Sequence, residues 1–256
     1  MLGSFGAMVN PNERSTFYER FWEDADYQLS YAFHAAVHGR FPAIQKVWGA
    51  MMSPQRVLDF GCGNGVLTYW MHCHGFGKEI VGIDVSTTAI EFATRQFGRS
   101  GLTFRTFSAD VGFAGLGTFD VVVASHVLEH LERPERVLAE VSTLAEWLVL
   151  EVPLEDCWAG RLASLLGTKR HTDNPVGHVN FWTRAGFRAF IESAGLVVVR
   201  DFQYAAAPFT PYQPRIKQLV ERAALGVLGL QLYGRLLATH HTLLARAGLL
   251  RTAPVG

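Results

Sequence analysis

The sequence predicts an α/β fold with a doubly wound, mostly parallel sheet. Short apolar runs rich in β-branched residues alternate over residues 51–205 with segments of helical periodicity. Strands and helices in that order build a parallel sheet that is covered on both faces. Glycines and polar residues follow several of the apolar runs, which is where sheets of this kind bind ligands. We expect a helical lid over residues 1–50 and a helical extension over 206–256 on either side of this domain.

Composition narrows the class of protein. The chain has 256 residues, of which 49% are hydrophobic and 18% charged, so one large domain with a substantial core is expected. Lys+Arg and Asp+Glu both number 23, a balance that argues against a nucleic-acid partner. The three cysteines are odd in number and form no C-x-x-C pair, which favours a reducing, cytoplasmic location.

The segment before the first strand is aromatic and helical in pattern. We expect helices that pack on the sheet edge, that cover a ligand as a lid, or that do both. The aromatic residues are Phe17, Tyr18, Phe21, Trp22, Tyr27, Tyr31, Phe33, Phe41 and Trp48.

The central stretch is residues 57–68, in which an apolar run ends at Asp59 and leads through Gly61, Gly63 and Gly65 into a helical segment. Side chains at these glycines would keep the backbone away from a bound ligand. The G-x-G-x-G spacing differs from the G-x-G-x-x-G of dinucleotide sites. A carboxylate at Asp59 would repel a pyrophosphate but suits an ammonium group, so an NAD-dependent enzyme is not expected.

Four more strands follow. Residues 79–84 end at Asp84, about 20 residues beyond the last glycine, where a carboxylate commonly binds ribose hydroxyls. A helix N-cap is the alternative role for Asp84, although Ser86 is the better cap. Residues 102–107 lead to Asp110, residues 119–124 lead to Ser125, and residues 147–152 end at Pro153.

These motifs together resemble those of the class I S-adenosylmethionine-dependent methyltransferases. The glycine turn, Asp84, Asp110 and the run from Ser125 to Leu131 stand in the family's order and spacing, and residues 182–196 are similar to a late unit of the UbiE/UbiG-like superfamily. The resemblance implies a Rossmann-like fold that binds S-adenosylmethionine and releases S-adenosylhomocysteine.

The resemblance also implies a role for each matching position. Asp59 and Gly61 would serve the methionine portion, and Gly63 would permit close approach of the backbone. The ribose would be bound at Asp84, adenine at Asp110 and the methionine end at Ser125. Cys62, Val85 and Val111 complete the cofactor-binding positions, together with His126, which would face either the cofactor or the acceptor.

On the acceptor side the candidates for a catalytic base are His178, His126 and His171. His171 and His178 lie in a long loop or insert over residues 154–180, where function concentrates. The alternative for His178 is a structural hydrogen bond within that loop. His126 and His130 are spaced for a shared metal ion, but no cysteine or carboxylate cluster supports them, so no metal is expected.

The tail from Pro214 to Leu250 is expected to be helical. It contains 12 consecutive uncharged residues between Arg222 and Arg235, too few to span a bilayer. We favour packing of this helix on the body of the protein or on a second subunit, as a homodimer. A membrane-surface helix is the alternative, because arginines flank the uncharged run.

The sequence therefore predicts a methyltransferase that acts on oxygen or nitrogen of a small-molecule acceptor by in-line displacement. A lipid or quinone-like acceptor at a membrane surface is one alternative, and a non-catalytic binder of S-adenosylmethionine is another.

Overall fold

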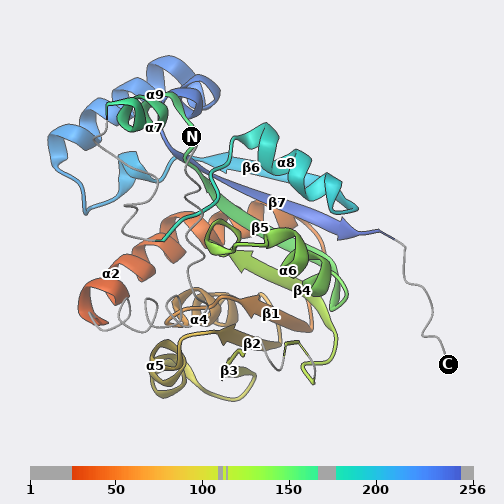
Figure 1. Ribbon diagram of the computed structural model, residues 1–256. Helices are drawn as coiled ribbons and strands as arrows, with labels where there is room; N and C mark the ends of the chain where they lie inside the picture. The colour runs from red at the N-terminus through yellow and green to blue at the C-terminus, as the bar shows by residue number, and fades with distance from the viewer. Residues whose placement is uncertain (1–24, 109–111, 114, 167–176, 249–256) are drawn as a thin grey trace, which may run out of the picture.

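A seven-stranded sheet carries the fold in the computed structural model, which describes residues 25–108, 112–113, 115–166 and 177–248 (Figure 1). The strand order is β3-β2-β1-β4-β5-β7-β6. Strands β1 to β5 pair in parallel, whereas β7 is antiparallel to both of its neighbours. The strands are β1 (Arg56–Phe60), β2 (Glu79–Asp84), β3 (Leu102–Thr106), β4 (Phe119–Ser125), β5 (Ala145–Leu154), β6 (Leu196–Tyr204) and β7 (Thr239–Ala247).

Helices cover both faces of the sheet, as expected for a doubly wound fold. On one face lie α3 (Phe41–Trp48), α4 (Val66–Cys73) and α5 (Thr87–Phe97); on the other lie α6 (Pro134–Val141) and α8 (Arg184–Ser193). The remaining helical segments are α2 (Ala25–Ala35), the π-helical turn η1 (Ala36–Arg40), the 3₁₀ turns η2 (Leu128–His130) and η4 (Ala207–Phe209), α7 (Trp158–Leu165) and α9 (Arg215–Leu236).

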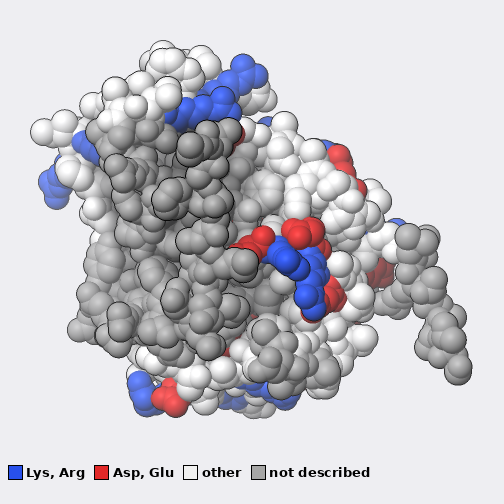
Figure 2. Space-filling model, in the orientation of Figure 1, with Lys and Arg blue, Asp and Glu red and all other residues white. Residues whose placement is uncertain are grey.

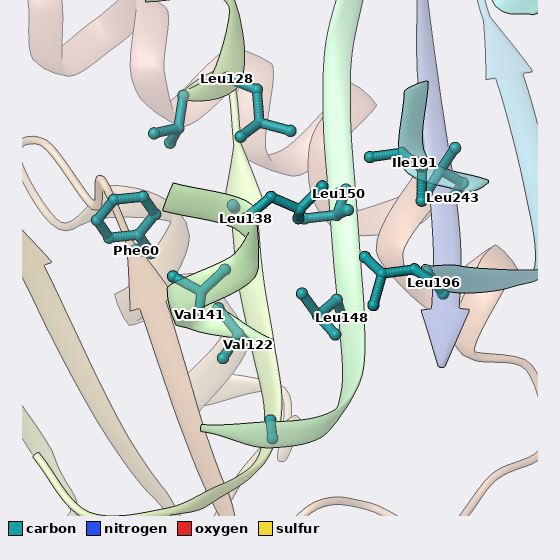
Figure 3. Packing of buried hydrophobic residues seen from close by; sticks show 14 of the residues in the cluster. Phe60, Val122, Leu128, Leu138, Val141, Leu148, Leu150, Ile191, Leu196 and Leu243 are labelled. Carbon is teal, nitrogen blue, oxygen red and sulfur yellow. The ribbon is translucent and has the colours of Figure 1, made fainter. Parts of the chain in front are cut away.

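The two-residue period of the strands sorts their apolar side chains into two cores. Val121 of β4 and Val149 of β5 pack towards α3, α4 and α5, while Val122 and Leu148 pack towards α6 and α8. Figure 3 shows the second core, in which Leu138 of α6 lies against the centre of the sheet. Strands buried on both faces account for the nearly continuous apolar runs in the sequence.

The predicted helical tail is wrong from residue 239 onwards, because residues 239–247 form β7. This strand inserts between β5 and β6, so the sheet extends well past the predicted domain boundary at residue 205. Its polar residues hid the strand pattern: Thr239, His241 and Thr242 are all buried. The burial of Thr239 and His241 is tolerated because each has a polar partner on β6. Thr239 accepts a hydrogen bond from Gln203, and His241 contacts Asp201.

Strand β5 also runs past its predicted end at Pro153. Its pairing with β4 stops at Glu151, and beyond that residue only β7 pairs with it. A proline lacks the N–H that a second neighbour would need, so it is accepted where the strand has one partner.

The flanking segments are partly as expected. Helix α3 buries Ile44 and Val47 in the core, so this part of the N-terminal region packs on the sheet. The 154–180 insert contains a helix, α7, that was not expected. No helix among the described residues has the length and hydrophobicity needed to cross a membrane.

Candidate active site

The glycine turn after β1 is shaped by the protein's own packing. Gly61 and Gly65 have φ of 73° and 78°, in the left-handed region that side chains disfavour. A Cβ on Gly65 would lie 2.7 Å from the ring of Phe104, and one on Gly61 would overlap Val127. Two of the three glycines are therefore required even without a ligand, and close approach of a ligand remains a proposal for Gly63.

Asp84 ties the ends of β1 and β2 together. Its Oδ2 accepts a hydrogen bond from the backbone N of Gly63 at 2.8 Å, and its Oδ1 accepts one from Ser86 N at 3.0 Å. Ser86, as expected, is the N-cap of α5 and accepts from Ala89 N. Val85 beside it is 42% exposed at the carboxyl edge of the sheet, open to a ligand.

Asp59 is more deeply buried than a simple ligand contact requires. Only 2% of the residue is exposed, and its Oδ2 accepts a hydrogen bond from Thr68 Oγ1 at 2.6 Å, which links β1 to α4. Burial raises the pKa of Asp59 to about 6, although the bond from Thr68 acts in the opposite direction. Cys62 is also buried, and burial together with the charge of Asp84 raises the pKa of its thiol, so the thiol is unreactive at neutral pH.

A buried polar cluster from four strands lies at the carboxyl ends of β4 and β5, where the sequence predicts the acceptor to bind. Glu151 of β5 accepts hydrogen bonds from Tyr204 Oη at 2.6 Å and from Ser125 Oγ at 3.1 Å. His126 Nε2 lies 3.6 Å from Glu151 Oε1 and 3.1 Å from Nδ1 of His240. The insertion of β7 brings His240 and Tyr204 to the carboxyl edge, because residue 240 pairs with both 153 and 204.

Charges in this cluster are strongly coupled. Burial alone would raise the pKa of Glu151, but the hydrogen bond and charge of His126 bring it down to about 2. Burial and the charge of Arg40 lower the pKa of His126, yet the adjacent carboxylates of Glu129 and Glu151 raise it overall. Burial, followed by the charge of His126, lowers the pKa of His240 to about 3. At neutral pH His240 is therefore neutral and Glu151 is ionised.

The backbone at His126 is unusual. Its φ is 60°, the only positive φ of a non-glycine residue among those described. This left-handed conformation costs roughly 1–2 kcal/mol, and the backbone N of His126 donates to Glu151 O at 3.0 Å. Strain of this kind collects at binding and catalytic sites.

A second cluster surrounds Glu129. His178 Nδ1 lies 2.6 Å from Glu155 Oε2, and the edge of its ring meets His130 with centroids 4.8 Å apart. The backbone O of Glu129 accepts from Val179 N at 2.8 Å, which fixes the end of the insert against η2. Since His126 Nδ1 lies 3.0 Å from Glu129 Oε1, the two predicted histidines, His126 and His178, flank the same carboxylate.

Within the described part of the chain, two sets of side chains could hold a metal ion by geometry. Ligand atoms of His126, Glu151 and His240 lie within 4.8 Å of one another, and so do those of Glu129, His130 and His178. The first set is satisfied by its own hydrogen bonds. In the second, both oxygens of Glu129 are buried without a hydrogen bond among the described residues, despite the close His126 nitrogen. The expectation of no metal rested on missing carboxylates, which Glu129 and Glu151 now supply.

Three predicted positions, Asp110, Val111 and His171, lie outside the described residues. The residues that sequence reasoning missed are Thr68, Glu129, Glu151, Tyr204 and His240. Glu151 could have been found as a lone charge inside an apolar strand, and Glu129 lies within a recognised motif. Tyr204 and His240 carried no signal, because only the placement of β7 brings them to the site.

The fold and site define a class of protein. A glycine turn between two strands that carry carboxylates, with a cluster of buried polar side chains at the ends of β4 and β5, is the arrangement expected of an S-adenosylmethionine-dependent methyltransferase. Residues 21–201 match the sequence profile of a family described as "Methyltransferase domain", and the chain belongs to this family.

Relatives of known name match only part of the chain. The ubiquinone biosynthesis O-methyltransferase of Burkholderia multivorans is 35% identical over 100 residues, which cover 38% of this chain and 42% of that protein. The chain thus aligns with less than half the length of the curated relatives that it matches.

Solved structures share the fold over most of the chain. Magnesium protoporphyrin IX methyltransferase from Synechocystis PCC 6803, with bound S-adenosylhomocysteine, is 17% identical with a TM-score of 0.58 and covers 91% of this chain and 94% of its own. The [4+2]-cyclase SpnF is 16% identical with a TM-score of 0.56, covering 80% and 78%. A cyclase on the same fold shows that the fold alone does not fix the reaction.

Proposed function

We propose that the protein transfers a methyl group from S-adenosylmethionine to an oxygen or nitrogen atom of a small-molecule acceptor. One observation carries the proposal: the cofactor elements at the ends of β1 and β2 share the carboxyl edge of the sheet with a carboxylate-paired histidine, His178. The 35% identical ubiquinone biosynthesis O-methyltransferase supports a hydroxyl acceptor. The equal numbers of acidic and basic residues support a small molecule rather than a nucleic acid.

The residues present fit S-adenosylmethionine. Asp84 and the exposed Val85 would hold the ribose, while Gly61, Gly63 and the buried Asp59 would hold the methionine portion. Ser125 and His126 would face the methionine end, and Asp110 would serve adenine. When bound, the cofactor supplies a methyl group on a sulfonium, which is already an activated leaving group. The protein's task is then to align the acceptor and exclude water.

The position of the π-helical turn η1 supports the proposed exclusion of water, because η1 lies near both the cofactor side and the acceptor side of the proposed site. The charge of Arg40, in η1, acts on both Asp59 and Glu151, so η1 reaches the donor side and the acceptor side together. Gly39 beside it packs on Tyr204, since a Cβ there would lie 3.0 Å from the Tyr204 ring. We infer that this segment acts as a lid.

Proton removal from the acceptor is assigned to His178. The Nδ1–Glu155 contact of 2.6 Å fixes the orientation of the ring, so Nε2 is the atom that would take the proton. His126 is less suited, because both ring nitrogens are already engaged: Nδ1 lies 3.0 Å from Glu129 and Nε2 lies 3.1 Å from Nδ1 of His240. His240 is less suited because its pKa of about 3 makes it a weak base. We assign these two histidines to the wall of the acceptor pocket.

The test is release of S-adenosylhomocysteine by the purified full chain with phenols, catechols, quinol analogues and amines. We expect turnover with at least one hydroxyl or amine class. His178→Ala should lower kcat by about 10²–10⁴ and remove the acidic limb of the pH–rate profile, while Glu155→Gln should give a smaller loss. His74→Ala, on the exposed end of α4, is the matched control. Tight cofactor binding without turnover across the panel would favour the non-catalytic binder.

A further inference from the structure

Helix α9 turns its apolar side outwards. Ile216, Leu219, Val220 and Val227 are 62–84% exposed, and their spacing of three, four and seven residues places them in one stripe along the helix. The charged residue Glu221 is buried instead, at 9% exposure. A helix that only packed on the protein body would show the reverse arrangement.

Helix α7, which packs beside α9, repeats this pattern. Trp158, Leu162, Leu165 and Leu166 stand at positions i, i+4, i+7 and i+8, on one side of the helix, and all are exposed. In Figure 1 the two helices lie side by side at one end of the sheet. Two adjacent apolar stripes exceed the scattered exposed residues that are ordinary on protein surfaces.

The charges beside the stripe on α9 are positive. Arg215, Lys217, Arg222 and Arg235 are exposed, and the one acidic residue of this helix, Glu221, pairs with Lys217 at 3.8 Å. Figure 2 shows a largely uncharged surface over this part of the molecule with Lys and Arg side chains around it.

We propose that α7 and α9 dock on an anionic lipid surface, with the apolar stripes in the interface and the cations at the headgroups. An exposed apolar stripe flanked by Lys and Arg is the pattern of a helix that lies in the plane of a membrane. A two-fold contact with a second copy would set the cations of α9 against each other. Docking on a lipid surface departs from the sequence-based preference for packing on the body or on a second subunit.

The docking surface adjoins the acceptor side of the site. Helix α7 begins at Trp158, just after β5 ends at Leu154, and α9 ends at Leu236, four residues before His240 of β7. The acceptor pocket would then open beside the headgroup region, where an amphiphilic acceptor is concentrated. Docking itself does not depend on the proposed reaction.

Vesicle co-sedimentation of the full chain tests the proposal. We expect binding to phosphatidylcholine vesicles that contain phosphatidylglycerol, weaker binding to phosphatidylcholine alone, and loss of binding at high salt. The double variant Val220→Glu/Val227→Glu should reduce partitioning by about tenfold or more. The double variant Arg215→Gln/Arg235→Gln should bind anionic vesicles more weakly and leave binding to phosphatidylcholine vesicles unchanged. Met52→Glu and Lys78→Gln, exposed positions elsewhere, are the matched controls.

Three results would overturn the proposal. Unchanged vesicle binding by the Val220→Glu/Val227→Glu variant would move the lipid contact elsewhere. A dimer in sedimentation velocity that this variant dissociates, with no vesicle binding by the wild type, would make the stripe a subunit interface. A strongly lowered Tm of the variant without lipid would show that the stripe is covered by residues of its own chain.

Discussion

Asp84 Oδ2 accepts a hydrogen bond from the backbone N of Gly63 at 2.8 Å, so a carboxylate at the end of β2 holds the glycine turn that follows β1. The contact gives Asp84 a structural role in addition to the proposed ribose contact. The two strands to which we assign the two halves of the cofactor are thereby coupled within the protein itself.

We therefore expect Asp84→Ala to weaken both cofactor binding and the fold. Loss of charge-assisted hydrogen bonds should cost about 1–3 kcal/mol in affinity for S-adenosylmethionine and about 1 kcal/mol in stability. Ser86→Ala is the control, since it removes the N-cap of α5 at about 1 kcal/mol of stability but should leave affinity unchanged. Calorimetry measures the affinity of both variants for S-adenosylmethionine, and thermal unfolding measures their stability. If Asp84→Ala keeps the wild-type affinity, Asp84 does not bind the ribose.

Asp59 should make the cofactor-free protein less stable as pH rises. Its pKa of about 6 in the folded protein lies above the ordinary value of 3.8. The loss of folding stability that comes from ionising the buried carboxyl group is therefore absent below about pH 4 and complete above about pH 6. Asp59→Asn should then raise stability at pH 8 by up to about 3 kcal/mol and have no effect near pH 4, while lowering cofactor affinity. Chemical unfolding at the two pH values measures this, and equal effects at both would contradict it.

Glu151 should make the protein more stable as pH rises, which is the opposite of the effect of Asp59. Its folded pKa of about 2 lies below the ordinary 4.5, so its contribution is present above about pH 4.5 and is lost as pH falls towards 2. Glu151→Gln removes one of the two buried carboxylates that face His126 and should cost about 3–5 kcal/mol at neutral pH. Tyr204→Phe, which removes one hydrogen bond from a neutral donor to the same carboxylate, should cost about 2 kcal/mol. Similar losses for the two variants at pH 7 would show that the ionic contact is weak.

Two requirements for glycine, a positive φ and the lack of space for a Cβ, can be separated by comparing the variants Gly65→Ala and Gly75→Ala. Gly65→Ala introduces both an unfavourable φ and overlap with Phe104, whereas Gly75→Ala has a similar φ of 69° and nothing within 4 Å of the new Cβ. We expect about 1 kcal/mol of destabilisation for Gly75→Ala and at least 2 kcal/mol more for Gly65→Ala. Thermal unfolding without cofactor checks the difference, and equal losses would leave the packing argument without support.

The donor half of the site could be read from the sequence because its signals are local. The apolar run to Asp59, the glycine turn and the strand that ends at Asp84 are each contiguous, and the side-chain period of a strand and the φ of a glycine turn are local properties. The N-cap at Ser86, whose Oγ accepts from Ala89 N, followed for the same reason.

The acceptor half was decided by tertiary structure. His240 joins His126 and Glu151 only because β7 enters the sheet between β5 and β6, and pairing over such a distance in sequence leaves no mark in local periodicity. The polar residues of β7 hid the strand, yet Thr239 and His241 are buried against Gln203 and Asp201 of the neighbouring strand β6. The orientation of α9 is equally non-local: its apolar and charged residues were visible in the sequence, but which side meets the protein was set by the elements around it.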